Sequence, residues 1–133
     1  MVEKDSVAFM FCDIRGFTSY TEKHGDEDAY ILASRHESIV RKSIEDNGGT
    51  LEKTLGDGVM VSFRTIQGAL NGSVRIQKEL SQYNKDQEKR IISTGIGVTF
   101  GDVVISGNDY FGKKVNLAKR LSDQAKGGQI LLG

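Results

Sequence analysis

The stretch Val7-Ala8-Phe9-Met10-Phe11-Cys12 is apolar at every position, and the charged residue Asp13 follows it directly. An apolar run without alternation predicts a strand that is buried on both faces of a sheet. A carboxylate at the end of such a strand is costly to place unless something binds it. Asp13 is therefore a candidate ligand for a divalent cation such as Mg²⁺, which prefers carboxylate and phosphate oxygens. The alternative is that Asp13 only caps the helix that follows.

Helical and extended patterns alternate along the rest of the chain. Helices are expected from the turn after Asp13 to about His24, from Glu27 to Asn47, from Ile66 to the charged stretch that starts at Lys85, and from Phe111 to Gln124. Strands are expected over residues 50–55, 59–63, 91–99 and 102–105, and from Gln129 onward. This order predicts an α+β fold, a ferredoxin-like split-βαβ sandwich whose mostly antiparallel sheet is covered by helices. A chain of 133 residues is expected to form a single domain over residues 1–133.

The composition excludes several classes of protein. Eighteen Lys and Arg residues balance eighteen Asp and Glu residues, and aromatic residues make up only 8%, so a nucleic-acid-binding surface is not expected. No run approaches the ~18 apolar residues of a membrane span, and no signal peptide opens the chain. Cys12 is the only cysteine, which excludes an internal disulfide and a thiolate zinc site. These features predict a domain without membrane contact and with a cytoplasmic location.

Three further patterns carry candidate chemistry. Gly16-Phe17-Thr18 opens a predicted helix, and free amide groups at a helix start can receive phosphate oxygens. Gly56-Asp57-Gly58 is a hairpin signal, and a carboxylate at that tip beside Asp13 would complete a two-carboxylate metal site. Asn116 and Arg120 lie four residues apart and therefore on one face of a predicted helix. The alternatives are an ordinary tight turn around Asp57 and a solvated helix face for the other two.

Taken together, these patterns resemble the catalytic domain of class III adenylate and guanylate cyclases. The resemblance rests on Phe11-x-Asp13-Ile14-x-Gly16-Phe17-Thr18, on Lys53-Thr54-Leu55-Gly56-Asp57-Gly58, and on Asp109-Tyr110-Phe111-Gly112 followed by Val115-Asn116-Leu117-Ala118-x-Arg120. It extends from about Val7 to Leu132, with the motifs in the family's order. The short connection between Val104 and Asp109 is similar to the subgroup with an abbreviated dimerisation arm. Because family domains generally continue with a further hairpin, the resemblance also implies that the chain is truncated at its C-terminus.

The resemblance implies a reaction and a role for each candidate residue. The domain would be an adenylate cyclase that converts ATP to 3′,5′-cyclic AMP and pyrophosphate by two-metal-ion catalysis. Asp13, Asp57 and the carbonyl oxygen of Ile14 would hold two Mg²⁺ or Mn²⁺ ions. The remaining roles would be reading of adenine by Lys53 and Asp109, substrate binding by Gly16, Phe17 and Thr18, orientation of the ribose by Asn116, and stabilisation of charge on the α-phosphate by Arg120.

The family resemblance further implies a homodimer with active sites at the subunit interface, and a regulatory sensor domain in the parent protein. Gly95 departs from the family pattern, because some members carry there an arginine that contacts the triphosphate. Two alternatives remain open: a catalytically inactive cyclase-homology domain that acts as a regulatory or dimerisation module, and a guanylate cyclase. Guanylate cyclases typically carry Glu and Cys, or a similar pair, where this chain has Lys53 and Asp109.

Overall fold

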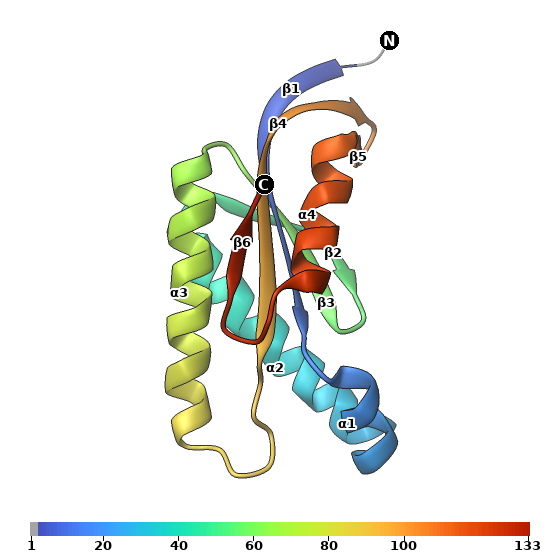
Figure 1. The fold of residues 1–133 in the computed structure, drawn as a ribbon, viewed down its shortest axis with the longest axis vertical. Coiled ribbons are helices and arrows are strands. Elements are labelled where there is room, and N and C mark those ends of the chain that lie inside the picture. The colour runs from blue at the N-terminus through green and yellow to red at the C-terminus, as the bar shows by residue number, and fades with distance from the viewer. Residues whose placement is uncertain (1–2) are drawn as a thin grey trace.

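The structure, a computed structural model that describes residues 3–133, is organised around the central strand β1 (Glu3–Ile14) (Figure 1). β1 pairs antiparallel with β3 (Gly58–Phe63) on one side and with β4 (Thr94–Ser106) on the other. β2 (Gly49–Leu55) and β5 (Asp109–Phe111) extend the sheet outward, and β6 (Ile130–Leu132) joins β4 in parallel. The order β2-β3-β1-β4-β5 confirms the mostly antiparallel sheet that the sequence predicts.

Four helices in the described part of the chain cover this sheet, which confirms the α+β class. α2 (Asp26–Glu45) and α3 (Ile66–Lys85) pack on one face, and α4 (Lys113–Gln124) packs on the other (Figure 1). α1 (Phe17–His24) follows the end of β1 and packs against α2. None of the helices within residues 3–133 combines the length and the apolar character that a membrane span requires.

The apolar run of β1 is buried on both faces, as the absence of alternation predicts. Ala8, Met10 and Cys12 pack into the core beneath α2 and α3, whereas Phe9 and Phe11 pack beneath α4. All five residues are 7% exposed or less. Burial raises the pKa of the Cys12 thiol to about 12, so this side chain is a neutral, apolar part of the core.

The sequence-based prediction is wrong at two places in this part of the chain: at Phe111, which is expected to start a helix but ends β5 because it pairs with Val104, and at β4. Residues 91–99 and 102–105 are expected to form two strands, but the structure has a single strand, β4, that runs from Thr94 to Ser106. β4 stays extended because its residues from Thr94 to Ile105 pair with β1, including the polar residues 3–6 of β1 that precede the apolar run. Gly101 lies within this strand instead of at a turn. A Cβ there would lie 2.9 Å from the side chain of Lys114, so the glycine makes room for α4.

Two further glycines in β4 let α4 approach the sheet backbone. A Cβ at Gly95 would lie 2.6 Å from the carbonyl oxygen of Ala125. A Cβ at Gly97 would lie 2.5 Å from the amide nitrogen of Ser122. Neither position has room for a side chain, so the second half of α4 packs directly on β4 and reaches the end of β1.

A buried chain of hydrogen bonds links α2 to the end of β1. His36 on α2 is 1% exposed, and its Nε2 lies 3.0 Å from the hydroxyl oxygen of Thr94. The Thr94 hydroxyl donates to the carbonyl oxygen of Asp13 at 2.6 Å. Since that hydroxyl has only one proton, His36 must be the donor in its contact with Thr94. Burial lowers the pKa of His36 to about 4, so the imidazole is neutral near pH 7.

We predict that the protein loses stability as the pH falls from 6.5 towards about 4, because of His36. The pKa of this histidine is lower in the folded chain than the usual 6.5, so the unfolded chain binds a proton in this range that the folded chain rejects. The stabilisation is fully present above pH 6.5, and its loss at low pH amounts to roughly 3 kcal/mol. Urea unfolding at a series of pH values between about 7.5 and about 4.5 measures the effect.

The matched variant for this measurement is His36→Gln, which keeps a side-chain donor for Thr94 and cannot titrate. Carboxylates elsewhere in the chain titrate in both proteins, so the difference between the two unfolding free energies isolates the histidine. The advantage of the unmodified protein should shrink as the pH falls. Parallel pH profiles for the two proteins would contradict the assignment.

Candidate functional site

Two carboxylates meet at the end of β1. Asp13 lies opposite Gly58, and Asp57 lies in the turn between β2 and β3. The amide of Ile14 donates to the carbonyl oxygen of Asp57 at 2.8 Å, which ties this turn to the end of β1. Gly58 permits the approach, because a Cβ there would lie 2.9 Å from the Cβ of Asp13. Asp13 and Asp57 line one cavity of about 260 Å³, and α4 contributes Lys119, Ser122 and Asp123 to its wall.

The carboxylate of Asp13 is held through one of its two oxygens. Oδ1 forms an ion pair with Arg15 and lies 3.3 Å from Ser122 Oγ, whose single proton is shared with the carbonyl oxygen of Gly95 at 3.0 Å. Arg15 is itself positioned by the carbonyl oxygens of Asp123, at 2.9 Å, and Ala125, at 3.0 Å. Within residues 3–133, Oδ2 of Asp13 accepts no hydrogen bond, so this second oxygen is available to a cation.

The donor set at this cavity fits a hard divalent cation. Asp13 and Asp57 supply carboxylate oxygens, which Mg²⁺ and Mn²⁺ prefer as ligands. Among the described residues, no cluster of three or more His, Cys, Asp and Glu side chains is arranged to hold a metal ion. One or two carboxylates together with substrate phosphates are the usual way in which proteins bind Mg²⁺. The cavity therefore suits a cation that is shared with a phosphorylated ligand.

The loop after β1 turns directly into α1. Gly16 has a φ of +72°, a left-handed conformation that glycine adopts without strain, and α1 starts at the next residue, Phe17. Within the described chain no side chain caps this helix, so the amide groups of its first turn, which includes Thr18, are left without a capping side chain. Such amide groups attract anions, since they carry the positive end of the helix dipole.

Lys53 and Asp109 face each other from β2 and β5. The ammonium nitrogen of Lys53 lies 2.8 Å from Oδ1 of Asp109, which also accepts a hydrogen bond from the amide of Tyr110 at 2.9 Å. The Lys53 ammonium and, to a smaller extent, this amide hold the pKa of the Asp109 carboxyl below its usual value. Neither Lys53 nor Asp109 lines the cavity that contains Asp13 and Asp57.

Asn116 and Arg120 are exposed on α4, one helical turn apart. Neither of them lines the cavity of Asp13 and Asp57, to which α4 contributes other side chains. Within one chain, the structure therefore brings the two aspartates together and pairs Lys53 with Asp109. It does not bring these two pairs and the Asn116–Arg120 face into one cavity.

The structure adds three residues around Asp13 that the sequence analysis does not single out. Arg15 and Ser122 hold the Asp13 carboxylate, and Thr94 binds its carbonyl oxygen. Arg15 lies in the turn directly after β1, and its separation of only two residues from Asp13 is the one signal that the sequence offers. Ser122 and Thr94 are 109 and 81 residues away from Asp13 along the chain, and no local pattern relates them to it.

Comparisons with known proteins identify relatives of this chain. The model of the family described as the adenylate and guanylate cyclase catalytic domain matches residues 1–133. An adenylate cyclase of Mycosarcoma maydis is 33% identical over an alignment of 150 positions, which covers 94% of this chain and 6% of that protein. The chain spans between 6% and 32% of the length of the curated relatives that it matches.

Solved structures share the fold as well. A bacterial light-regulated adenylyl cyclase is 32% identical with a TM-score of 0.83, over 92% of this chain and 71% of that chain. The guanylyl cyclase Cya2 is 25% identical with a TM-score of 0.84, over 98% of this chain and 75% of that chain. Because the family model matches every residue from 1 to 133, this chain belongs to the family of adenylate and guanylate cyclase catalytic domains.

Proposed function

We propose that this domain is an adenylate cyclase that converts ATP to 3′,5′-cyclic AMP and pyrophosphate in intracellular signalling. The observation that carries the proposal is the placement of Asp13 and Asp57 on one cavity at the end of β1, in a chain of the cyclase family. Such a carboxylate pair suits phosphoryl transfer assisted by divalent ions. Cyclase domains of this family generally use divalent metals.

Asp13, Asp57 and the carbonyl oxygen of Ile14 are the proposed ligands of two Mg²⁺ or Mn²⁺ ions. When bound, such ions make the ribose 3′-hydroxyl a better nucleophile and neutralise charge on the triphosphate. The ion pair with Arg15 already holds Oδ1 of Asp13, so the carboxylate is oriented before any ligand arrives. The backbone hydrogen bond from the amide of Ile14 to the carbonyl oxygen of Asp57 keeps the turn that carries Asp57 close to Asp13.

The rest of the substrate is positioned by α1 and α4. In the reaction, the 3′-oxygen of ribose forms a bond to the α-phosphorus, the bond from this phosphorus to the pyrophosphate oxygen breaks, and the hydroxyl proton is released. The amide groups at Gly16, Phe17 and Thr18 receive phosphate oxygens at the start of α1. Asn116 orients the ribose, and the guanidinium of Arg120 stabilises the charge that builds up on the α-phosphate in the transition state.

Lys53 and Asp109 are the proposed recognition pair for the base. A lysine donor suits N1 of adenine, and a carboxylate accepts from the 6-amino group, whereas guanine reverses this pattern at both positions. Relatives named adenylate cyclase at about 30% identity support this assignment. A guanylyl cyclase shares the fold at 25% identity, so the fold alone does not determine whether adenine or guanine is bound. The choice of ATP over GTP depends on this pair.

A homodimer would bring the separated residues together. Asp13 and Asp57 of one protomer would face Lys53, Asp109, Asn116 and Arg120 of the second protomer, and two-fold symmetry would create two equivalent sites. The location of Asn116 and Arg120 outside the aspartate cavity of their own chain supports this arrangement. The relatives are several times longer than this chain, so we also propose a regulatory sensor domain in the parent protein. The proposed substrate of the cyclase domain, ATP, is present in the cytoplasm, and we propose a cytoplasmic location for this domain.

We predict that Asp57→Asn lowers the rate of cyclic AMP formation in the full-length protein by roughly 10³-fold or more, since the neutral amide is a poor cation ligand. Initial rates at saturating ATP and Mn²⁺ measure the loss. Asp123→Asn is the matched control, because its side chain lines the same cavity but has no proposed role in metal binding. Near-normal turnover of Asp57→Asn, or equal losses in both variants, would remove the metal assignment.

We predict that the full-length protein prefers ATP to GTP by about 10²-fold or more in kcat/KM. A site built on specific hydrogen bonds rejects the wrong base strongly, because mismatched groups are left buried and unpaired. Replacing the pair by Lys53→Glu together with Asp109→Cys should erode this preference. Equal kcat/KM values for the two nucleotides in the unmodified protein would show that the pair is misassigned.

Mixing two inactive variants tests the shared site. Asp57→Ala and Asn116→Ala should each be nearly inactive as homodimers of the full-length protein. In a mixed dimer, one site carries both lesions and the other site carries none. Random pairing makes about half of the dimers mixed, so cyclic AMP formation should return to about a quarter of the normal rate. If subunit exchange is demonstrated and the mixture stays inactive, the shared-site arrangement is wrong.

A further inference from the structure

A β-bulge in β2 places two neighbouring side chains on the same face of the sheet. The pairing of β2 with β3 shifts register between Leu51 and Lys53, so Glu52 is an extra residue in the strand. In a regular strand, Glu52 and Lys53 would point to opposite faces. In this chain both side chains lie on the face of the sheet that α4 partly covers. Lys53 pairs with Met60, which packs on that face. Glu52 accepts a hydrogen bond from Ser62, which lies two residues farther along β3 and therefore on the same face.

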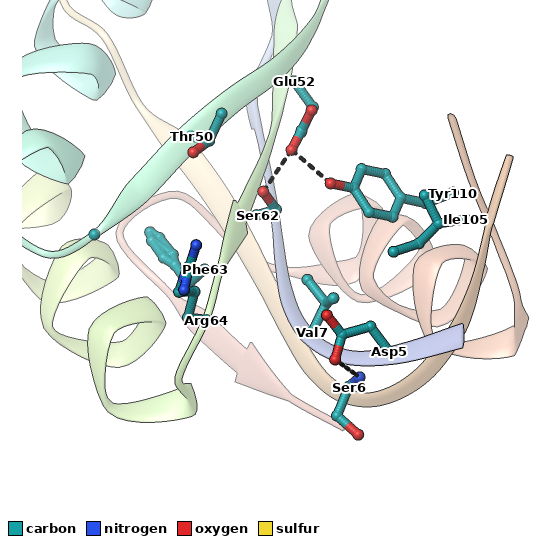
Figure 2. A pocket seen from close by; sticks show the side chains of 11 residues that line it. Asp5, Ser6, Val7, Thr50, Glu52, Ser62, Phe63, Arg64, Ile105 and Tyr110 are labelled. Carbon is teal, nitrogen blue, oxygen red and sulfur yellow. Dashed lines mark hydrogen bonds between the residues drawn. The ribbon is translucent and has the colours of Figure 1, made fainter. Parts of the chain in front are cut away.

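Both side chains reach β5, which lies at the opposite end of the strand order. The hydroxyl of Tyr110 donates to Oε2 of Glu52 at 2.9 Å, and the hydroxyl of Ser62 donates to the same oxygen at 2.6 Å (Figure 2). Beside this contact, the ammonium group of Lys53 lies 2.8 Å from Oδ1 of Asp109. Two adjacent bridges therefore join consecutive residues of β2 to consecutive residues of β5.

The two bridges differ in how well the protein supports them. The side chains of Lys53 and Asp109 are 42% and 44% exposed, and an ion pair this open contributes little to the stability of the fold. Glu52 and Tyr110 are half-buried and line a pocket of about 600 Å³. The ring of Tyr110 packs edge-on against the buried Phe9, with ring centroids 5.1 Å apart. Burial, together with the Glu52 carboxylate, raises the pKa of Tyr110, so its hydroxyl stays protonated as a donor.

We infer that Glu52 and Tyr110 are positioning residues for base recognition: their hydrogen bond holds β5 against β2, so that Lys53 and Asp109 present a donor and an acceptor at a fixed spacing. The inference rests on the proposed function, in which Lys53 and Asp109 bind the purine. Ser62 orients the Glu52 carboxylate from β3, and the contact between the Tyr110 ring and β1 fixes the other partner. Without this bond, only an exposed ion pair bridges these residues of β2 and β5.

Tyr110→Phe tests the inference, because it removes the hydroxyl and keeps the ring against Phe9. In the full-length protein with Mn²⁺, KM for ATP should rise about tenfold while kcat changes by less than about threefold. The ratio of kcat/KM for ATP to kcat/KM for GTP should fall about tenfold. A loss of folded protein alone would lower the apparent kcat for both nucleotides and leave KM and this ratio unchanged.

Three companion variants separate the hydrogen bond from general effects. Glu52→Ala should reproduce the loss, whereas Glu52→Gln, whose amide oxygen still accepts from Tyr110, should keep the ratio within about threefold of normal. Combining Tyr110→Phe with Glu52→Ala should cost no more than either change alone, because both remove one shared interaction. Tyr83→Phe on α3 is the matched control, since its hydroxyl contacts only Arg35 among the described side chains.

Lys53→Ala distinguishes the failure of this inference from the failure of the proposed function. If Lys53→Ala lowers the ATP-to-GTP ratio but Tyr110→Phe changes neither KM nor the ratio, the positioning role is overturned and the base assignment stands. If Lys53→Ala leaves the ratio unchanged, the base assignment fails and the inference fails with it. A loss in Glu52→Gln as large as the loss in Glu52→Ala would also overturn the positioning role.

Discussion

The antiparallel pairing of β1 with β4 is the constraint on which the rest of the structure depends. It extends over all twelve residues of β1 and places the apolar half of this strand at the centre of the sheet. A strand without an exposed face needs cover on both sides, which α2 and α3 provide on one side and α4 on the other. The same pairing brings Asp13 beside the start of β4, where Thr94 binds its carbonyl oxygen. At the other end, β4 continues into the hairpin that carries Asp109. The position of the core strand β1 thus determines where Asp13 and Asp109 lie.

The close packing of α4 on β4 gives a physical reason for one departure from the family pattern. Some cyclases carry an arginine where this chain has Gly95, but here a Cβ at that position would lie 2.6 Å from the carbonyl oxygen of Ala125. The same packing puts Ser122 in contact with Asp13 and presents two carbonyl oxygens of α4 and its C-cap to Arg15. A guanidinium group therefore does lie beside the aspartate cavity, and it comes from the loop after β1. The chain thus combines the close packing of α4 on β4 with a positive charge, that of Arg15, beside Asp13.

Candidate residues in this fold are held in place by neighbouring side chains and backbone groups. Asp13 is paired with Arg15 and contacted by Ser122, and Asp109 is paired with Lys53 and bonded to the amide of Tyr110. Both arrangements join segments that are far apart along the chain, so they exist only once the sheet has formed. The candidate residues of one chain nevertheless remain in separate places, and this separation is what a two-fold symmetric dimer would resolve.

The sequence by itself determined the elements whose side chains repeat with a regular period, the doubly buried strand 7–12, and the family to which the motifs point. Periodicity reports which side of an element is buried, so it identified the three amphipathic helices, and the turn residues Gly56-Asp57-Gly58 identified the hairpin around Asp57. It failed at Gly101, which has the composition of a turn but lies in a strand because β1 pairs across it. It also missed the polar start of β1, which has no apolar pattern to reveal it.

Only the tertiary structure decided the bulge at Glu52 and the contacts of Asp13 with Thr94 and Ser122. These features depend on strand register and on how closely a helix approaches a sheet, and neither quantity is encoded in any local stretch of residues.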